Sequence, residues 1–139
     1  MKKIIISLLI CVGLIHTTIW AYPFPKGPVD LTGLQVPGNA PIGSRLATKT
    51  TNSQQKLQAN NINWTLEARL RWRTDDGKEG NCTQYNVAHI TTLVTGGSWK
   101  AASDGSYKPA NDRNKNYYVQ FRTTNGNSDN LSGKWYLDI

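Results

Sequence analysis

The stretch INWTLEARLRWRT, at residues 62–74, alternates between apolar and polar side chains at every position. Such alternation matches a β-strand, in which successive side chains point to opposite faces, whereas a helix would scatter the same apolar residues around its circumference. We therefore predict a strand whose apolar face lies in a core, with Trp64 and Trp72 as its largest members. The other face carries three arginines about 7 Å apart, since a strand rises about 3.3 Å per residue: Arg69, Arg71 and Arg73.

Further alternating segments follow, and no part of the mature chain shows sustained helical periodicity. We predict additional strands at residues 81–94, 117–123 and 131–139, the first with a bulge or a short break near residues 89–92. Turns are predicted at 75–80, which contains Asp-Gly, and at 124–130, which contains Asn-Gly. These features predict an all-β chain, folded as a single antiparallel β-sandwich of the immunoglobulin-like kind.

The segment before the first long strand has a different composition. Residues 22–43 hold five of the six prolines, and proline lacks the amide donor that a central strand needs. We therefore predict extended entry and edge structure there. Residues 47–61 are polar with little pattern, and we predict an exposed loop or a poor edge strand.

The N-terminus has the layout of a secretory signal peptide. Two lysines precede an apolar run at residues 4–15, and Ala21 ends a plausible cleavage site. The run is too short to remain as a membrane span. We predict a signal peptide at 1–21 and one domain at 22–139, exported and without a membrane span. Removal of the lysines at positions 2 and 3 lowers the net charge from +7 to +5, which still favours acidic partners.

The mature chain offers little catalytic or metal-binding chemistry. It contains one cysteine, Cys82, and one histidine, His89, so an internal disulfide and the usual multi-ligand zinc sites are excluded. The thiol is expected to be buried, paired between chains or reactive. No catalytic triad motif, phosphate loop or calcium loop occurs. We expect no enzymatic activity, no catalytic residues, no metal and no cofactor, with a carboxylate-dependent hydrolase as an open alternative.

A long loop is the first candidate for a binding site. Residues 95–116 are rich in Gly, Ser, Asn and Asp, and loops of this length are often functional. Aromatic faces suit the C–H surface of a sugar, and amide or carboxylate groups suit its hydroxyls. The predicted ligand-binding residues are Trp99, Asp104, Tyr107, Asn111 and Asp112. In the alternative interpretation, the two aromatic residues fold back as a lid over the core.

The segment LQVPGNAPIGSRL, at residues 34–46, resembles a strand of adhesins and minor subunits of bacterial chaperone–usher fimbriae. The resemblance implies an immunoglobulin-like subunit that passes through the periplasm with a chaperone and an usher, joins other fimbrial subunits and recognises a host glycan. Two features depart from the family pattern. Cys82 has no disulfide partner, and the prolines within 22–28 prevent that segment from donating a strand to a neighbour. A tip subunit or an adhesin's receptor domain is the implied role.

The sequence therefore predicts a secreted or fimbrial cell-surface binding protein that recognises a host surface ligand, with a glycan as the expected class, through the 95–116 loop. The alternative is a small secreted inhibitor or toxin-associated module that binds a protein or polyanion through the three arginines. Nucleic acid is not an expected partner, because the chain carries a secretory signal. Ionic strength distinguishes glycan binding through the loop from binding through the arginines, since arginine contacts weaken as salt rises.

Overall fold

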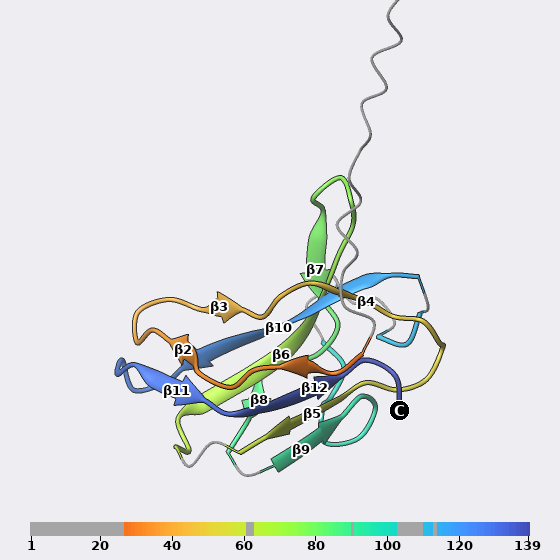
Figure 1. The fold of residues 1–139 in the computed structure, drawn as a ribbon. Coiled ribbons are helices and arrows are strands. Elements are labelled where there is room, and N and C mark those ends of the chain that lie inside the picture. The colour runs from red at the N-terminus through yellow and green to blue at the C-terminus, as the bar shows by residue number, and fades with distance from the viewer. Residues whose placement is uncertain (1–26, 61–62, 90, 103–109, 113) are drawn as a thin grey trace, which may run out of the picture.

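Figure 1 shows the computed structural model, which describes residues 27–60, 63–89, 91–102, 110–112 and 114–139. The described residues form strands and no helix, so the all-β prediction is confirmed. The strands are β1 (Val29–Asp30), β2 (Leu34–Val36), β3 (Ile42–Gly43), β4 (Ala47–Thr48), β5 (Lys56–Ala59), β6 (Leu66–Arg73), β7 (Glu79–Asn81), β8 (Asn86–Val87), β9 (Thr91–Val94), β10 (Asn116–Thr123), β11 (Asp129–Leu131) and β12 (Gly133–Tyr136). In this part of the chain, no helix is long and apolar enough to cross a membrane.

The strands form two main antiparallel sheets. The four-stranded sheet has the order β1-β12-β5-β9, and the six-stranded sheet has the order β3-β10-β6-β7, with β4 also paired to β10 and β8 to β6. A small sheet pairs β11 with β2. The proline-rich segment supplies β1 and β3, each at the edge of its sheet, as proline content predicted.

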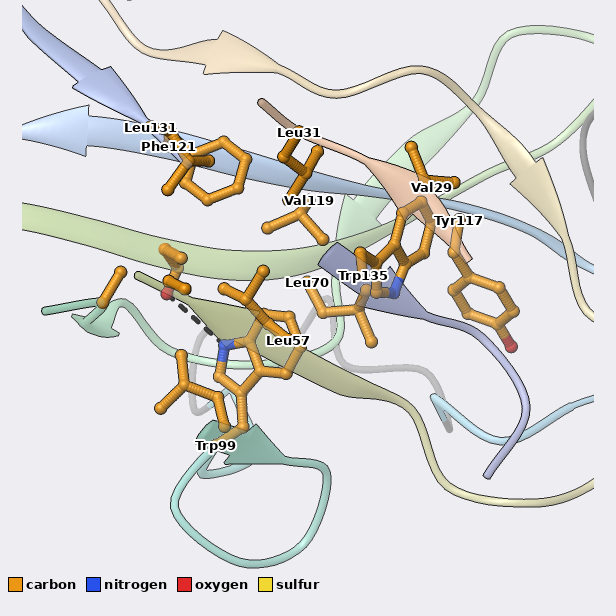
Figure 2. Close-up of a cluster of buried hydrophobic side chains, with 14 of the residues drawn as sticks. Val29, Leu31, Leu57, Leu70, Trp99, Tyr117, Val119, Phe121, Leu131 and Trp135 are labelled. Carbon is orange, nitrogen blue, oxygen red and sulfur yellow. Dashed lines mark hydrogen bonds between the residues drawn. The ribbon is translucent and has the colours of Figure 1, made fainter. Parts of the chain in front are cut away.

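The core lies between the two main sheets, as Figure 2 shows. Trp135 and Leu57 come from the four-stranded sheet, while Leu70, Val119 and Phe121 come from the six-stranded sheet. All five side chains are buried. Burial of large apolar side chains on both facing sheets is the main source of stability for such a sandwich.

Strand β6 confirms the period-two prediction over its own length. Leu66, Ala68 and Leu70 are fully buried, and the polar residues between them are partly exposed. Its neighbour β10 pairs with it along all eight residues, from Leu66 opposite Thr123 to Arg73 opposite Asn116. The two longest strands therefore present one apolar face inward and one polar face outward.

Trp64 is not the core residue that the alternation predicted. Its side chain is 71% exposed and its ring lies 3.9 Å from the ring of the buried His89, measured between centroids. The strand begins only at Leu66, because Asn63 Oδ1 accepts hydrogen bonds from the backbone amide and the hydroxyl of Thr65. Trp64 therefore lies in an Asx turn that precedes the strand, and strand parity does not apply to that residue. Trp72 is partly buried against the core.

The prediction of a loop or edge strand at 47–61 is wrong for β5. This strand lies inside the four-stranded sheet, between β12 and β9, with Leu57 and Ala59 buried. The adjoining Gln55 is also buried, and its side chain is satisfied there: Nε2 donates to Ala110 O at 2.5 Å, and Oε1 accepts from Trp135 Nε1 at 3.0 Å. A polar segment can enter the core here because both ends of the buried Gln55 amide have a hydrogen-bond partner.

The predicted return strand at 81–94 is divided between the two sheets. Strands β7 and β8 pair with β6, whereas β9 pairs with β5 in the other sheet. The break in apolar parity predicted near residues 89–92 lies where the chain passes from β8 in the six-stranded sheet to β9 in the four-stranded sheet. Residue 90 itself lies outside the described residues.

Candidate ligand-binding face

A polar face rich in arginine and tyrosine covers the outside of the six-stranded sheet. Residues directly opposite in an antiparallel pair share a face, and the register places Arg71 opposite Tyr118, and Arg69 opposite Gln120. We use the name arginine–tyrosine face for nine residues, which come from the outward sides of β6 and β10, from Glu79 on β7, and from Tyr85 between β7 and β8. Its members are Glu67, Arg69, Arg71, Arg73, Glu79, Tyr85, Tyr118, Gln120 and Arg122.

One end of this face is a closed cluster around Tyr85. The guanidinium carbons of Arg69 and Arg122 lie 4.5 and 3.9 Å from the centroid of the tyrosine ring. Arg69 Nε and the Tyr85 hydroxyl both donate to Gln120 Oε1, at 2.8 and 3.2 Å, and Arg122 Nε donates to Glu67 Oε2 at 2.7 Å. Burial raises the pKa of Tyr85 despite the nearby arginines, so the phenol stays neutral and able to donate.

The other end is organised around Arg71 and Glu79. A terminal nitrogen of Arg71 lies 3.2 Å from Glu79 Oε1, and the Tyr118 hydroxyl donates to Glu79 Oε2 at 2.9 Å. Burial, reinforced by this hydrogen bond, raises the pKa of Tyr118 to about 12, although Arg71 and Arg69 oppose the shift. The tyrosine therefore holds the glutamate in place as a neutral donor at physiological pH.

Two donor groups at this end have no acceptor among the residues that the structure describes. The Nε atom of Arg71 is buried and has no hydrogen-bond partner among the described residues. Arg73 is exposed, and no described residue forms an ion pair or hydrogen bond with its guanidinium. Of the two, only the exposed guanidinium of Arg73 can meet an anion from solvent, and its position on a paired strand means that the backbone needs no further ordering.

A β-bulge creates a hollow beside these arginines. Gly43 pairs with Gln120 but Ala47 pairs with Tyr117, so the edge strand carries one residue more than β10 between the two pairs. At the bulge, Ser44 Oγ accepts a hydrogen bond from the Val119 amide at 3.0 Å, which replaces a backbone acceptor. The hollow has a volume of about 260 Å³. It is lined by Gly43, Ser44, Leu46, Arg71, Arg73, Glu79, Tyr118 and Gln120.

The face as a whole is positively charged. Its four arginines stand against two glutamates, Glu67 and Glu79, which leaves two positive charges in excess. Glu67 neutralises Arg122 and Glu79 neutralises Arg71. The excess charge therefore belongs to Arg69 and Arg73, of which Arg69 is hydrogen-bonded to a neutral amide. An anionic ligand is attracted most directly to Arg73.

Trp99, which the sequence suggested as a sugar-stacking residue, is a core residue. Its side chain is fully buried, and its indole Nε1 donates to Ala68 O at 3.4 Å beneath β6, as the dashed line in Figure 2 shows. An indole ring covered on all sides cannot stack on a ligand. The ligand-binding role predicted for Trp99 is therefore wrong, and the alternative in which this residue packs onto the core holds for it.

Of the other predicted loop residues, the structure describes Asn111 and Asp112. Asn111 Oδ1 accepts a hydrogen bond from Thr95 Oγ1 at 3.1 Å, which ties the loop to the end of β9. Asp112 is exposed and lines a cavity of about 50 Å³ beside Trp72. Asp104 and Tyr107 lie outside the described residues, so their predicted roles stay predictions.

The sequence contained part of the signal for the arginine–tyrosine face. Alternation in β6 and β10 placed the arginines and Tyr118 outward correctly. The contributions of Tyr85 and Glu79 were missed, because both belong to short irregular segments whose approach to β6 depends on strand pairing. No local pattern marks a residue that reaches a face from a neighbouring strand.

The Cys82 thiol is buried. Burial raises the pKa of Cys82 to about 12, so the thiol is protonated and unreactive at neutral pH. The prediction that this cysteine is buried is confirmed. Within the described part of the chain, no group of three or more His, Cys, Asp or Glu side chains is placed to hold a metal ion.

The chain was compared with known proteins at the level of both sequence and structure. No protein-family model, curated protein or solved structure matches it.

Proposed function

We propose that this protein is an exported binding protein that recognises an acidic ligand at a cell surface through the arginine–tyrosine face. The observation that carries the proposal is the set of outward arginines fixed on β6 and β10, with Arg73 left without an ionic partner in the described part of the chain. Arginine and tyrosine are the residue types that dominate the energetics of binding surfaces. Both present large rigid groups whose ordering on binding costs little entropy.

The position of these residues on paired strands supports a binding role. Arg69 and Arg122 are held against Tyr85, and Arg71 is held by Glu79, so three of the four guanidinium groups are ordered before any ligand arrives. Pre-ordered groups gain affinity because less conformational entropy is lost on binding. Surface arginines with no role in binding are more often solvated and unrestrained.

The wider setting of the proposal comes from the sequence. The signal peptide and the fimbrial resemblance of residues 34–46 support export through the periplasm and assembly as a tip subunit or adhesin, with a chaperone, an usher and other subunits as partners. An immunoglobulin-like connectivity belongs to the same proposal. The described fold, an antiparallel two-sheet sandwich, is compatible with it. The proposed activity is binding, without catalysis.

A glycan and protein array at low and high ionic strength tests the proposal. We expect binding to acidic members of the array, with affinity that falls as salt rises, because the contacts are largely ionic. The double substitution Arg69→Gln and Arg122→Gln removes two charges from the face and should lower affinity about tenfold or more. The matched control is Lys56→Gln with Lys134→Gln, which removes two charges from the opposite sheet.

Two outcomes would contradict the proposal. Preference for neutral glycans, with no response to salt, would point to a different surface. An equal loss of affinity in the two double variants would mean that only the net charge matters and that the arginine–tyrosine face has no special role.

A further inference from the structure

The hollow at the β-bulge combines donors and one acceptor in a small space. Arg73 brings a guanidinium to which no described residue is ion-paired, and Arg71 brings one that Glu79 holds in place. Glu79, whose side chain is 38% exposed, still offers carboxylate lone pairs to an incoming donor. The lining is therefore mixed in charge.

Gln120 contributes a donor of fixed direction. Its Oε1 atom accepts from both Arg69 Nε and the Tyr85 hydroxyl. Because a guanidinium nitrogen can only donate, these bonds fix which end of the amide is oxygen. The amide nitrogen has no described partner, and its two N–H groups remain available to ligand oxygens. The closed cluster around Tyr85 thereby orients a donor that lines the hollow.

We infer that this hollow binds one sugar residue that carries a carboxylate, with the carboxylate paired to Arg73 and the hydroxyls bound by Gln120 and Glu79. The inference rests on the proposed function and names the ligand class of the same face. Sialic acids and uronic acids share this chemistry, since each combines one carboxylate with several hydroxyls on a single ring.

The size and charge of the hollow select this class. Its volume of about 260 Å³ lies below the roughly 300–1,000 Å³ of pockets for drug-sized ligands, so it suits a single ring. Glu79 repels a densely charged polyanion but accepts hydrogen bonds from hydroxyl groups. A ligand with one negative charge and neighbouring hydroxyls satisfies both arginine and glutamate.

Gly43 keeps the wall of the hollow open. A Cβ atom at this position would lie 3.1 Å from Cδ2 of Tyr118, closer than ordinary packing. Gly43→Ala therefore changes the shape of the hollow by one methyl group and leaves every charge in place. This variant separates a shaped site from a diffuse attraction between charges.

Calorimetric titration of the purified protein tests the inference with paired probes. The acidic probes are 3′-sialyllactose and cellobiouronic acid, and their neutral parents are lactose and cellobiose. We expect at least one acidic probe to bind and its neutral parent not to bind, and the member that binds identifies sialic or uronic acid as the source. Arg73→Ala should lower the affinity about tenfold or more, while Arg73→Lys retains part of it because the charge remains but the planar fork is lost.

The control variant is Lys134→Ala, which removes one exposed charge from the opposite sheet and should leave the affinity unchanged. Gly43→Ala should weaken binding with an unchanged circular dichroism spectrum. The inference is overturned if neither acidic probe binds, if the neutral parents bind equally, or if Arg73→Ala and Lys134→Ala have the same effect.

These results can be told apart from failure of the proposed function. Array binding to acidic ligands that persists in Arg73→Ala but is lost in the Arg69→Gln and Arg122→Gln double variant would overturn the hollow as the site and leave the face as a binding surface. Absence of binding to every acidic ligand in the unmodified protein would overturn both.

Discussion

The arginine–tyrosine face and the segment around Trp99 were both candidate binding regions, and they differ in where their aromatic side chains lie. On the face, Tyr85 and Tyr118 sit among outward arginines and support them. In the other region, the tryptophan is fully buried under β6 and contributes to the core. An aromatic residue in a polar, glycine-rich segment is therefore as able to anchor that segment as to bind a ligand.

The difference arises from the backbone that carries each side chain. On paired strands, the ladder fixes which residues point outward, so a row such as Arg69 and Arg71 is held on one face. After β9, no ladder with a long strand fixes the direction of Trp99. The direction of the Trp99 side chain is then set by burial, because covering a tryptophan gains more free energy than leaving it exposed.

The largest effect is expected from Trp99→Ala. Removal of a fully buried indole leaves a cavity in the core, and we expect a loss of about 3–5 kcal/mol in the free energy of unfolding. Denaturant titration followed by circular dichroism measures it. A loss below about 1 kcal/mol would contradict the assignment of Trp99 to the core, since such a small value is typical of surface substitutions rather than core truncation.

Alkaline pH affects both regions through groups whose pKa is raised by burial. Cys82, whose backbone oxygen accepts from Ala102 after the Trp99 segment, and Tyr118 on the face both have a pKa raised to about 12 in the folded protein. Each group is neutral in the folded state where its unfolded counterpart already ionises. Their contribution to stability is therefore complete below about pH 9 and is lost as the pH rises towards 12.

We expect Cys82 to contribute a loss of roughly 2 kcal/mol by pH 11. Urea titrations across this pH range measure the loss, and Cys82→Ala should flatten the slope more than Tyr118→Phe, since the thiol begins to ionise at lower pH when unfolded. In the native protein at pH 8, a thiol reagent should label Cys82 only on opening of the fold, and faster in Trp99→Ala. Rapid labelling of the unmodified protein would contradict the burial of this region.

Within the face, Arg69→Ala should lower the free energy of unfolding by about 1 kcal/mol. This side chain donates to Gln120 and covers Tyr85, and a hydrogen bond from a charged group combined with a cation–π contact at a partly exposed site has this order of magnitude. Thermal and urea unfolding measure the change. No change would show that the cluster around Tyr85 is not held by its arginines.

Arg73→Ala should change stability by less than about 0.5 kcal/mol, because this residue is exposed and has no described ionic partner. Its substitution is expected to affect ligand affinity instead. Arg69 and Arg73 should therefore behave differently, because Arg69 belongs to the cluster around Tyr85 and Arg73 lines the hollow at the other end of the face. A stability loss at Arg73 as large as that at Arg69 would remove the distinction.

Trp64→Ala should have the smallest effect of all, also within about 0.5 kcal/mol. Its side chain is 71% exposed and contacts the ring of His89. The contrast with Trp99→Ala compares two tryptophans whose positions the sequence assigned the wrong way round. Near-equal losses in the two variants would mean that Trp64 is packed far more closely than its exposure indicates.

Much of the fold and part of the site could be predicted from residue patterns. Alternation gave the inward and outward faces of β6 and β10, and the prolines placed β1 and β3 at edges. Prediction failed where a turn interrupted parity, as at Trp64. It also failed for β5, a polar segment whose buried Gln55 is satisfied by partners distant in the sequence.

The sequence by itself determined the all-β architecture, the arginine row on β6 and the positive charge of the chain. Side-chain direction is a local property, because it alternates along any strand regardless of the neighbouring strands. Net charge depends on composition alone. Only the tertiary structure decided which arginines are neutralised, where the bulge opens a hollow, and which tryptophan is buried. Each of these depends on register and burial across the sheets, which are set by contacts between segments far apart in the chain.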